Sequence, residues 1–210
     1  MKRFIFVIVL LIGSIEAFTQ VKIGLQLSPT ISSNRVETQS NEFSIKNGGS
    51  KLKFKFGIVA DFPLSDNYYF STGLLYTPKR VSLIAIEQPD GMPNTEEYDL
   101  QYLQIPLTMK LYTNEITLDT KLFFNLGVNA EIAISEKFDK DNEIIEDFKL
   151  FDTSLVLGAG VERKIGTNTA VYVAIMYNRG LINPISKSMD IDEKILLKND
   201  MIGLDLGVKF

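Results

Sequence analysis

Apolar and polar residues alternate along seven separate stretches of this chain, and that period constrains the fold more than any other feature. A period of two places successive side chains on opposite faces of a β-strand, so each stretch predicts a strand with one apolar face. The stretches begin at Ile23, Phe54, Leu103, Leu122, Leu155, Val171 and Ile202. A less regular stretch from Tyr68 to Thr77 brings the predicted total to eight strands.

Many of these stretches are about ten residues long. A tilted strand needs roughly 9–11 residues to cross the hydrocarbon layer of a membrane, whereas strands of globular proteins cluster nearer 5–6. After residue 20, no apolar run of the chain approaches the length of a spanning helix, about eighteen residues. Strand length therefore favours a barrel that spans a membrane over a soluble sandwich.

The predicted connections between the strands alternate between long and short. The long ones are residues 32–53, 79–97, 135–149 and 183–199, and the short ones are 63–67, 113–117 and 166–168. Outer-membrane barrels of bacteria have long external loops and tight periplasmic turns. The sequence therefore predicts an eight-stranded antiparallel up-and-down transmembrane β-barrel, with the long loops at one end and both ends of the mature chain at the other.

The face opposite the apolar one carries charged residues interleaved with glycines. The charged residues are Lys55, Asp61, Lys110, Lys121, Glu131, Glu162, Asp205 and Lys209. Glycines on an exposed surface would weaken each strand without any packing benefit, but they suit a narrow interior crowded by side chains. An eight-stranded barrel is only just wide enough for its own side chains. We therefore predict a lumen filled by paired charges, with the apolar face turned to lipid.

The first residues have the layout of a secretory signal peptide. Lys2 and Arg3 precede an apolar run from Phe4 to Ile12, and small residues follow it. The run is too short to cross a bilayer as a helix. We predict a signal peptide at residues 1–19 and a barrel domain at 20–210, with an uncleaved N-terminal membrane anchor as the alternative.

Composition removes most catalytic machinery. The chain has no cysteine and no histidine, so it lacks thiolates and imidazoles for nucleophilic, acid–base or zinc chemistry. Glu131 and Glu162 are carboxylates of the kind that work in pairs, but lysines share their face, so we expect both to be structural. With 26 acidic and 22 basic residues and no basic stripe, nucleic acid is not an expected partner. We predict no catalytic residue, metal site or cofactor.

Several segments resemble strands of the PorT-like outer-membrane β-barrel family of Bacteroidetes-type bacteria. The segment Tyr102–Leu107 resembles its "YLxIPL" strand, Leu157–Glu162 its "GAGxE" strand and Tyr177–Asn183 its "YxxGLxN" strand. Leu206–Phe210 resembles its terminal strand. At Gly73, this chain departs from the Glu of the family's "ELLY" strand.

The resemblance carries expectations about partners. It implies export to the bacterial outer membrane, contact with outer-membrane lipid, and recognition of the C-terminal strand, with its final Phe210, by the barrel-assembly machinery. A named member of the family takes part in secretion linked to gliding motility, so the resemblance also points to a secretion-system or surface protein as a partner.

We interpret the chain as a non-catalytic, integral outer-membrane barrel of structural or interaction type, whose loops carry its function in secretion or surface contact. Two other classes stay open. One is a soluble, secreted β-barrel that binds an apolar ligand. The other is a membrane-embedded lipid-modifying enzyme, which without histidine would need a Ser–Lys or carboxylate mechanism.

Overall fold

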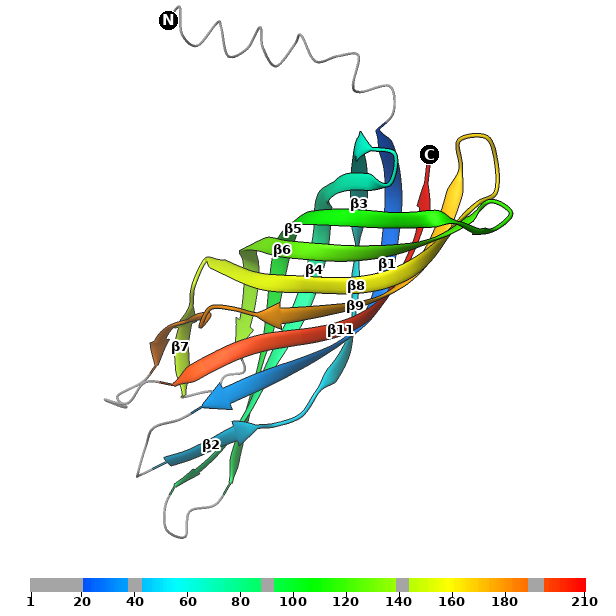
Figure 1. Cartoon of the computed structure of the whole chain (residues 1–210). Coiled ribbons are helices and arrows are strands. Elements are labelled where there is room, and N and C mark those ends of the chain that lie inside the picture. Colours follow the sequence, from blue (N-terminus) through cyan, green and yellow to red (C-terminus); the bar gives the residue numbers. More distant parts are fainter. Residues whose placement is uncertain (1–20, 38–42, 88–92, 139–143, 189–194) are drawn as a thin grey trace, which may run out of the picture.

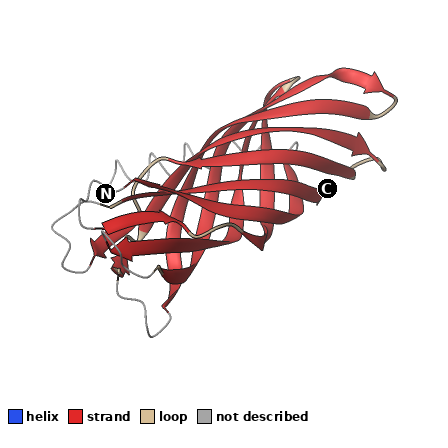
Figure 2. Cartoon of the chain, turned by 90° about the horizontal axis from the view of Figure 1, so that it is seen from below, coloured by secondary structure: helices blue, strands red, loops and turns tan. Residues whose placement is uncertain are grey.

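A computed structural model of the chain describes residues 21–37, 43–87, 93–138, 144–188 and 195–210. The predicted signal peptide lies outside these residues. The described residues form strands and connecting loops, as Figure 2 shows. Among them there is no helix long and apolar enough to cross a membrane.

Eight strands close into a ring in which every neighbouring pair is antiparallel (Figure 1). In ring order they are β1 (Lys22–Glu37), β3 (Lys51–Ser65), β4 (Tyr68–Glu87), β5 (Asn94–Thr117), β6 (Thr120–Phe138), β8 (Phe151–Lys164), β9 (Ala170–Gly180) and β11 (Leu196–Lys209). The last strand pairs with the first, with Leu206 opposite Leu27 and Val208 opposite Leu25. The predicted eight-stranded antiparallel barrel is therefore confirmed, including its closure.

The register of the ring is staggered. Paired residues followed from Lys22 through all eight strands lead back to β1 at Ser32, ten residues farther along the same strand. A closed barrel requires such a stagger, and it tilts the strands by roughly 35–45° to the barrel axis. Closure gives each strand of the ring a partner on both sides.

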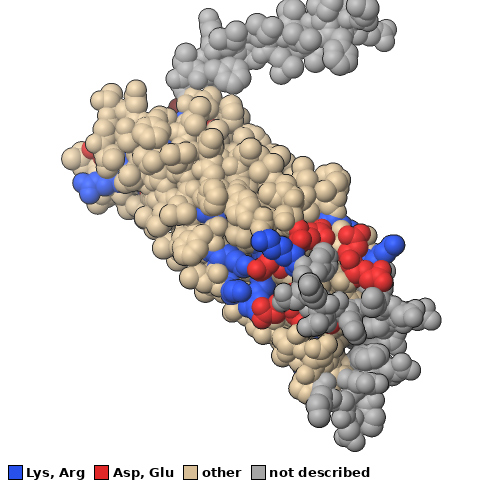
Figure 3. All heavy atoms as spheres, turned by 180° about the vertical axis from the view of Figure 1, so that it is seen from behind, with Lys and Arg blue, Asp and Glu red and all other residues tan. Residues whose placement is uncertain are grey.

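The outer face of the barrel is apolar and the inner face is polar, as predicted. Along β11 and the residue that follows it, Leu204, Leu206 and Phe210 are 36–59% exposed, whereas Asp205 and Lys209 between them are buried. Lys, Arg, Asp and Glu gather toward one end of the face in Figure 3, leaving a broad middle zone without charge. An inverted barrel, with its apolar face turned inward around a ligand, does not fit this arrangement.

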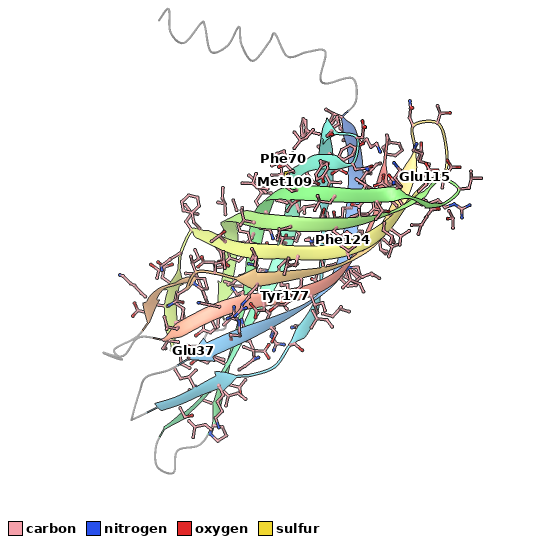
Figure 4. All side chains as sticks on the ribbon, viewed as in Figure 1. Glu37, Phe70, Met109, Glu115, Phe124 and Tyr177 are labelled. Atoms are coloured by element: carbon pink, nitrogen blue, oxygen red, sulfur yellow. The ribbon has the colours of Figure 1, made fainter. Side chains whose placement is uncertain are left out.

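Both ends of the apolar zone can be located. On β5, outward apolar residues run from Leu103 to Leu111, a span of nine residues that matches the hydrocarbon layer. In Figure 4, Glu37 lies toward one end of the molecule, at the end of β1, and Glu115 lies at the other end, with Phe124 on the wall between them. We call the end with Val21, Phe210 and the three short connections the turn end, and the opposite end the loop end.

The long connections were wrongly predicted as loops. β1 continues to Glu37, β4 to Glu87 and β6 to Phe138, while β5 already begins at Asn94. Three short strands also lie in these connections: β2 (Phe43–Asn47), β7 (Ile145–Phe148) and β10 (Ile185–Ser188). The sheet therefore extends well past the apolar zone at the loop end. Inward side chains beyond that zone pack into a separate apolar core, which stabilises this extension.

One of the three short connections was also misplaced. Residues 113–117 belong to β5, and the turn follows at Leu118–Asp119, where Asp119 has a φ of 59°. Asp residues tolerate this left-handed conformation better than most. Of the other two short connections, residues 66–67 lie within the predicted range 63–67, and residues 165–169 extend one residue beyond the predicted range 166–168 on each side.

Strand β4 changes its neighbouring strand near Pro78. Pairing of β3 with β4 ends at Phe56 and Tyr76. Farther along β4, the N–H of Arg80 donates to the Ser32 hydroxyl at 3.2 Å, so alternate residues of β4 present their N–H groups to this edge. Pro78 has the same orientation but no N–H to donate. Side chains of β1, and then β2, replace β3 as the partner of β4.

An arginine on the lipid-facing row of β11 tests the closed, lipid-exposed barrel. We expect Leu206→Arg to lower the free energy of unfolding in lipid vesicles by roughly 2–4 kcal/mol, because the guanidinium would lie near the middle of the hydrocarbon. The matched change Phe210→Arg, at the end of the row, should cost only about 0–1 kcal/mol. Equal costs at the two positions would contradict the assigned depth of the row.

Candidate functional site

The lumen is closed near the turn end by a cluster of four charged side chains from four strands. Lys209 Nζ lies 2.5 Å from an Asp61 carboxylate oxygen and 2.6 Å from a Glu162 carboxylate oxygen. Lys110 Nζ lies 3.0 Å from Asp61, and the Ser71 hydroxyl donates to the same carboxylate. All five side chains are buried. This arrangement confirms the predicted pairing of opposite charges in the lumen.

Aromatic rings pack around this cluster. The Tyr112 hydroxyl donates to Glu162, and Lys209 Nζ lies 4.7 Å from the centre of the Tyr172 ring. Two glycines on the polar face leave room for the rings: a Cβ added at Gly207 would lie 2.3 Å from Tyr172, and one at Gly160 would lie 2.5 Å from the Phe123 ring. These two glycines therefore have the packing role that the sequence analysis expected.

A second charged cluster crosses the lumen toward the loop end. Lys79 Nζ lies 3.0 Å from Asp152 and also donates to the Glu131 carboxylate, while the Tyr102 ring centre lies 4.8 Å from the same ammonium. The sequence analysis missed both residues, because it placed Lys79 in the 79–97 connection and began the next predicted strand only after Asp152. A signal for Lys79 was available in the sequence: it lies two residues after Thr77, so the strand's period of two places it on the same inward face.

The two carboxylates considered for acid–base chemistry are held in different clusters. Glu131 is bound by Lys79, and Glu162 by Lys209. Between the clusters, Lys55 Nζ lies 3.4 Å from Asp205, beside a cavity of about 40 Å³. Such a cavity has room for about three water molecules. The described part of the lumen is therefore a packed interior in which both carboxylates are paired with lysines.

Beyond Lys79 the polarity of the sheet inverts. On β5, Tyr98 and Leu100 point inward and are fully buried, while Glu97 and Asp99 point outward. Twelve buried apolar residues form one core at the loop end: Ile45, Val81, Leu83, Tyr98, Leu100, Tyr102, Ile144, Ile145, Phe148, Ile185, Ile195 and Leu197. We call the part of the molecule around this core, with β2, β7 and β10, the head.

Within the head, hydrogen bonds attach β7 to β5. The buried Glu96 carboxylate accepts the Ile144 N–H at 3.0 Å and the Tyr98 hydroxyl, and the Tyr98 oxygen accepts the Ile145 N–H at 3.0 Å. Burial raises the pKa of Tyr98, and the bond to Glu96 raises it further, so the phenol stays protonated. Ile144 and the start of β7 are therefore held against β5.

One asparagine joins the two ends of the last connection. The side-chain amide of Asn183 donates to the Ile195 carbonyl at 2.8 Å, and its oxygen accepts the N–H groups of Ile185 and Leu197 at 3.2 and 3.3 Å. Asn183 thus joins the start of β10 to the start of β11. It is the final residue of the segment that resembles the "YxxGLxN" strand.

Two other residues of that segment meet an ion pair on the outside of the head's base. The Arg35 guanidinium forms two bonds to Asp200, at 2.6 and 3.0 Å, and donates to the Gly180 carbonyl. The Gly180 N–H and the Tyr177 hydroxyl donate to the same Asp200 carboxylate. This network links β1, β9 and β11 at the edge of the apolar zone.

A closed antiparallel sheet with an apolar outer belt and a charged, packed interior defines a membrane-spanning β-barrel protein. Residues 17–186 match the protein family described as outer membrane protein beta-barrel domain, and the chain belongs to that family. Within the described residues, no three His, Cys, Asp or Glu side chains are placed to hold a metal ion.

The solved structure of OprG agrees with this fold. OprG, an outer-membrane protein of Pseudomonas aeruginosa, is 12% identical, with a TM-score of 0.60 over 90% of this chain and 95% of that one. Neisserial surface protein A is 15% identical, with a TM-score of 0.47 over 89% of this chain and 95% of that one. At 12% identity, the likeness to OprG concerns the fold alone. No curated protein matches the chain.

The charged clusters predict a cost for removing one partner. Glu162→Ala leaves the buried Lys209 ammonium short of a carboxylate, and breaking a buried ion pair costs roughly 3–5 kcal/mol. We expect a loss of that size in the free energy of unfolding, measured by urea titration in lipid vesicles. Glu146→Ala, at an exposed glutamate of β7, is the matched control and should be nearly neutral. A comparable loss in both variants would argue against the lumen assignment.

Removing the Tyr98 hydroxyl should affect the head and leave the stability of the barrel nearly unchanged. Tyr98→Phe removes the hydroxyl that accepts the Ile145 N–H and donates to Glu96, without changing the barrel wall. We expect faster proteolytic cleavage in residues 135–150, with little change in the global free energy of unfolding, because local opening needs only the head contacts to break. Tyr76→Phe, on the outer wall, should leave the cleavage rate unchanged. Unaltered protection in the Tyr98 variant would show that the hydroxyl does not hold β7.

Proposed function

We propose that this protein is a non-catalytic outer-membrane barrel that acts through its head, as a contact site for another protein at the cell surface or in a secretion apparatus. One observation carries the proposal: the lumen is packed with paired charges, while the sheet continues beyond the membrane belt into a head with its own apolar core. The described part of the head is therefore a packed unit, and not only a set of connections between strands.

The orientation follows from the arrangement of the two ends. The turn end carries the short connections and Val21, and tight turns face the periplasm in barrels of this kind. The head would then face outward from the cell. Export by cleavage of residues 1–19, and recognition of the final strand by the barrel-assembly machinery, belong to the same proposal.

The alternative functions fit less well. A soluble carrier would expose its belt to water, where residues such as Leu25, Phe56 and Ile175 are each about half exposed or more. A lipid-modifying enzyme needs a reactive group, but the lumen carboxylates described above are bound by lysines. The apolar core of the head is packed from several strands, and this suits a rigid contact surface.

Site-specific cross-linking in intact cells tests the proposal. A photo-reactive residue at Asp147 or Lys187, both exposed on the head, should give a discrete adduct with one protein. The same residue at Leu126, in the middle of the belt, should give none. Adding Tyr98→Phe should weaken the head adducts, because it loosens β7.

Orientation needs its own control, and the absence of native cysteine makes one available. Single cysteines at Asn94 and Lys187 should react with an impermeant thiol reagent on intact cells, while one at Asn168 should react only after the outer membrane is opened. Labelling of Asn168 in intact cells would reverse the orientation, and absence of any head adduct would contradict the contact role.

A further inference from the structure

A second feature, independent of the head, lies at the turn end. A hollow of about 500 Å³ opens between the β3–β4 turn, the β8–β9 hairpin and the adjoining ends of β1 and β11. Volumes of roughly 300–1,000 Å³ are typical of sites for small molecules. The polar part of its wall consists of Lys22, Tyr69, Lys164, Thr167, Asn168 and Thr169, with Lys209 at the wall toward the lumen.

The side chains around the hollow are unequal in charge. Three of the lining residues are lysines, and none is Asp or Glu. Lys209 is buried and held by Asp61 and Glu162, so it serves the lumen. Lys22, one-third exposed and 3.5 Å from Glu162, and the exposed Lys164 can offer charge to a ligand.

Acidic side chains lie to one side of the hollow. Asp66, Glu115 and Asp119 line a smaller neighbouring hollow of about 80 Å³, together with Glu162. Lys22 and Lys164 contribute to the walls of both hollows. Lys22 and Lys164 thus lie between a smaller hollow, which Lys121 also lines, and a larger hollow lined by no Asp or Glu side chain. The larger hollow is the better suited of the two to a negatively charged group.

The larger hollow adjoins the apolar belt. Phe210 contributes to its wall and is also the last residue of the lipid-facing row on β11, with 59% of its surface exposed. Ile165, 61% exposed, follows Lys164 directly. Lysines at such a boundary lay their methylene chains on apolar surface and keep the ammonium at headgroup level. A lipid whose chains lie against β11 would therefore place its headgroup at the hollow.

We propose that this hollow binds the phosphate of a phospholipid in the leaflet at the turn end. Lys22 and Lys164 supply the positive charge, and the hydroxyls of Thr167 and Thr169 with the amide of Asn168 supply hydrogen-bond donors. The acyl chains continue along the apolar row that ends at Phe210. The site holds whichever way the head points and whatever the head contacts.

Lipid retention by the mature protein tests the site. The protein is placed in phosphatidylcholine nanodiscs that contain a small fraction of phosphatidylglycerol, and bound lipid is measured by native mass spectrometry. The double variant Lys22→Gln with Lys164→Gln should retain phosphatidylglycerol at least about tenfold less well, because each basic group near an anionic surface contributes about 1 kcal/mol. The matched control, Lys46→Gln with Lys187→Gln on the head, should retain it like the unaltered protein.

Two further measurements test whether the variant is folded and whether the bound phosphate belongs to a lipid. Far-ultraviolet circular dichroism should show the same strand content in all proteins, since the changed lysines are partly or fully exposed. Inorganic phosphate at millimolar concentration should displace little of the lipid. Full displacement by phosphate would reassign the hollow to a soluble anion and overturn the lipid site. Equal retention by the double variant and its control would overturn anion binding there altogether.

Discussion

Hydrocarbon offers no hydrogen-bond partner to a peptide group, and the structure depends on that constraint. Each unpaired N–H or C=O in the membrane would cost several kcal/mol, so a sheet can cross only if it has no edge. Pairing of β11 with β1 removes the edge. A closed barrel of eight strands then has an interior only just wide enough for its own side chains. In this barrel, the side chains that fill the interior include buried charges, and each of these charges lies close to a charge of opposite sign.

The same constraint explains the change at the loop end. Where the sheet leaves the lipid, water can solvate the outer face. There, Glu97 and Asp99 occupy the outward positions of β5, whereas apolar residues occupy them from Leu103 to Leu111. The inner face is then free to become apolar, and Leu100 with Leu197 enters a packed core. Pro78 lies near this transition, where β4 exchanges its partner. One continuous set of strands thus forms a membrane barrel and a water-exposed head with opposite polarity.

The predictable part of the fold was the part that lipid determines. Period-two alternation located seven of the eight spanning strands, and a less regular stretch marked the eighth, because outward positions in lipid must be apolar. The same alternation located inward charges such as Glu131 and Asp205. The head was missed because its connections are rich in polar residues, and their short apolar alternations, such as Val81 and Leu83, were taken for loop sequence. The partner of each lumen charge and the hollow beside Lys164 depend on register and barrel stagger, which one sequence does not encode in any local pattern.

The inversion of polarity at the membrane surface can be measured directly, since the chain contains no tryptophan. Single tryptophans at Leu107 and Asp99 would both face outward on β5, eight residues apart, in vesicles of brominated phospholipid. The structure predicts strong quenching by lipid bromine at position 107, with weak quenching by aqueous iodide, and the reverse at position 99. Equal quenching of both positions by brominated lipid would place the head in the membrane and contradict the account.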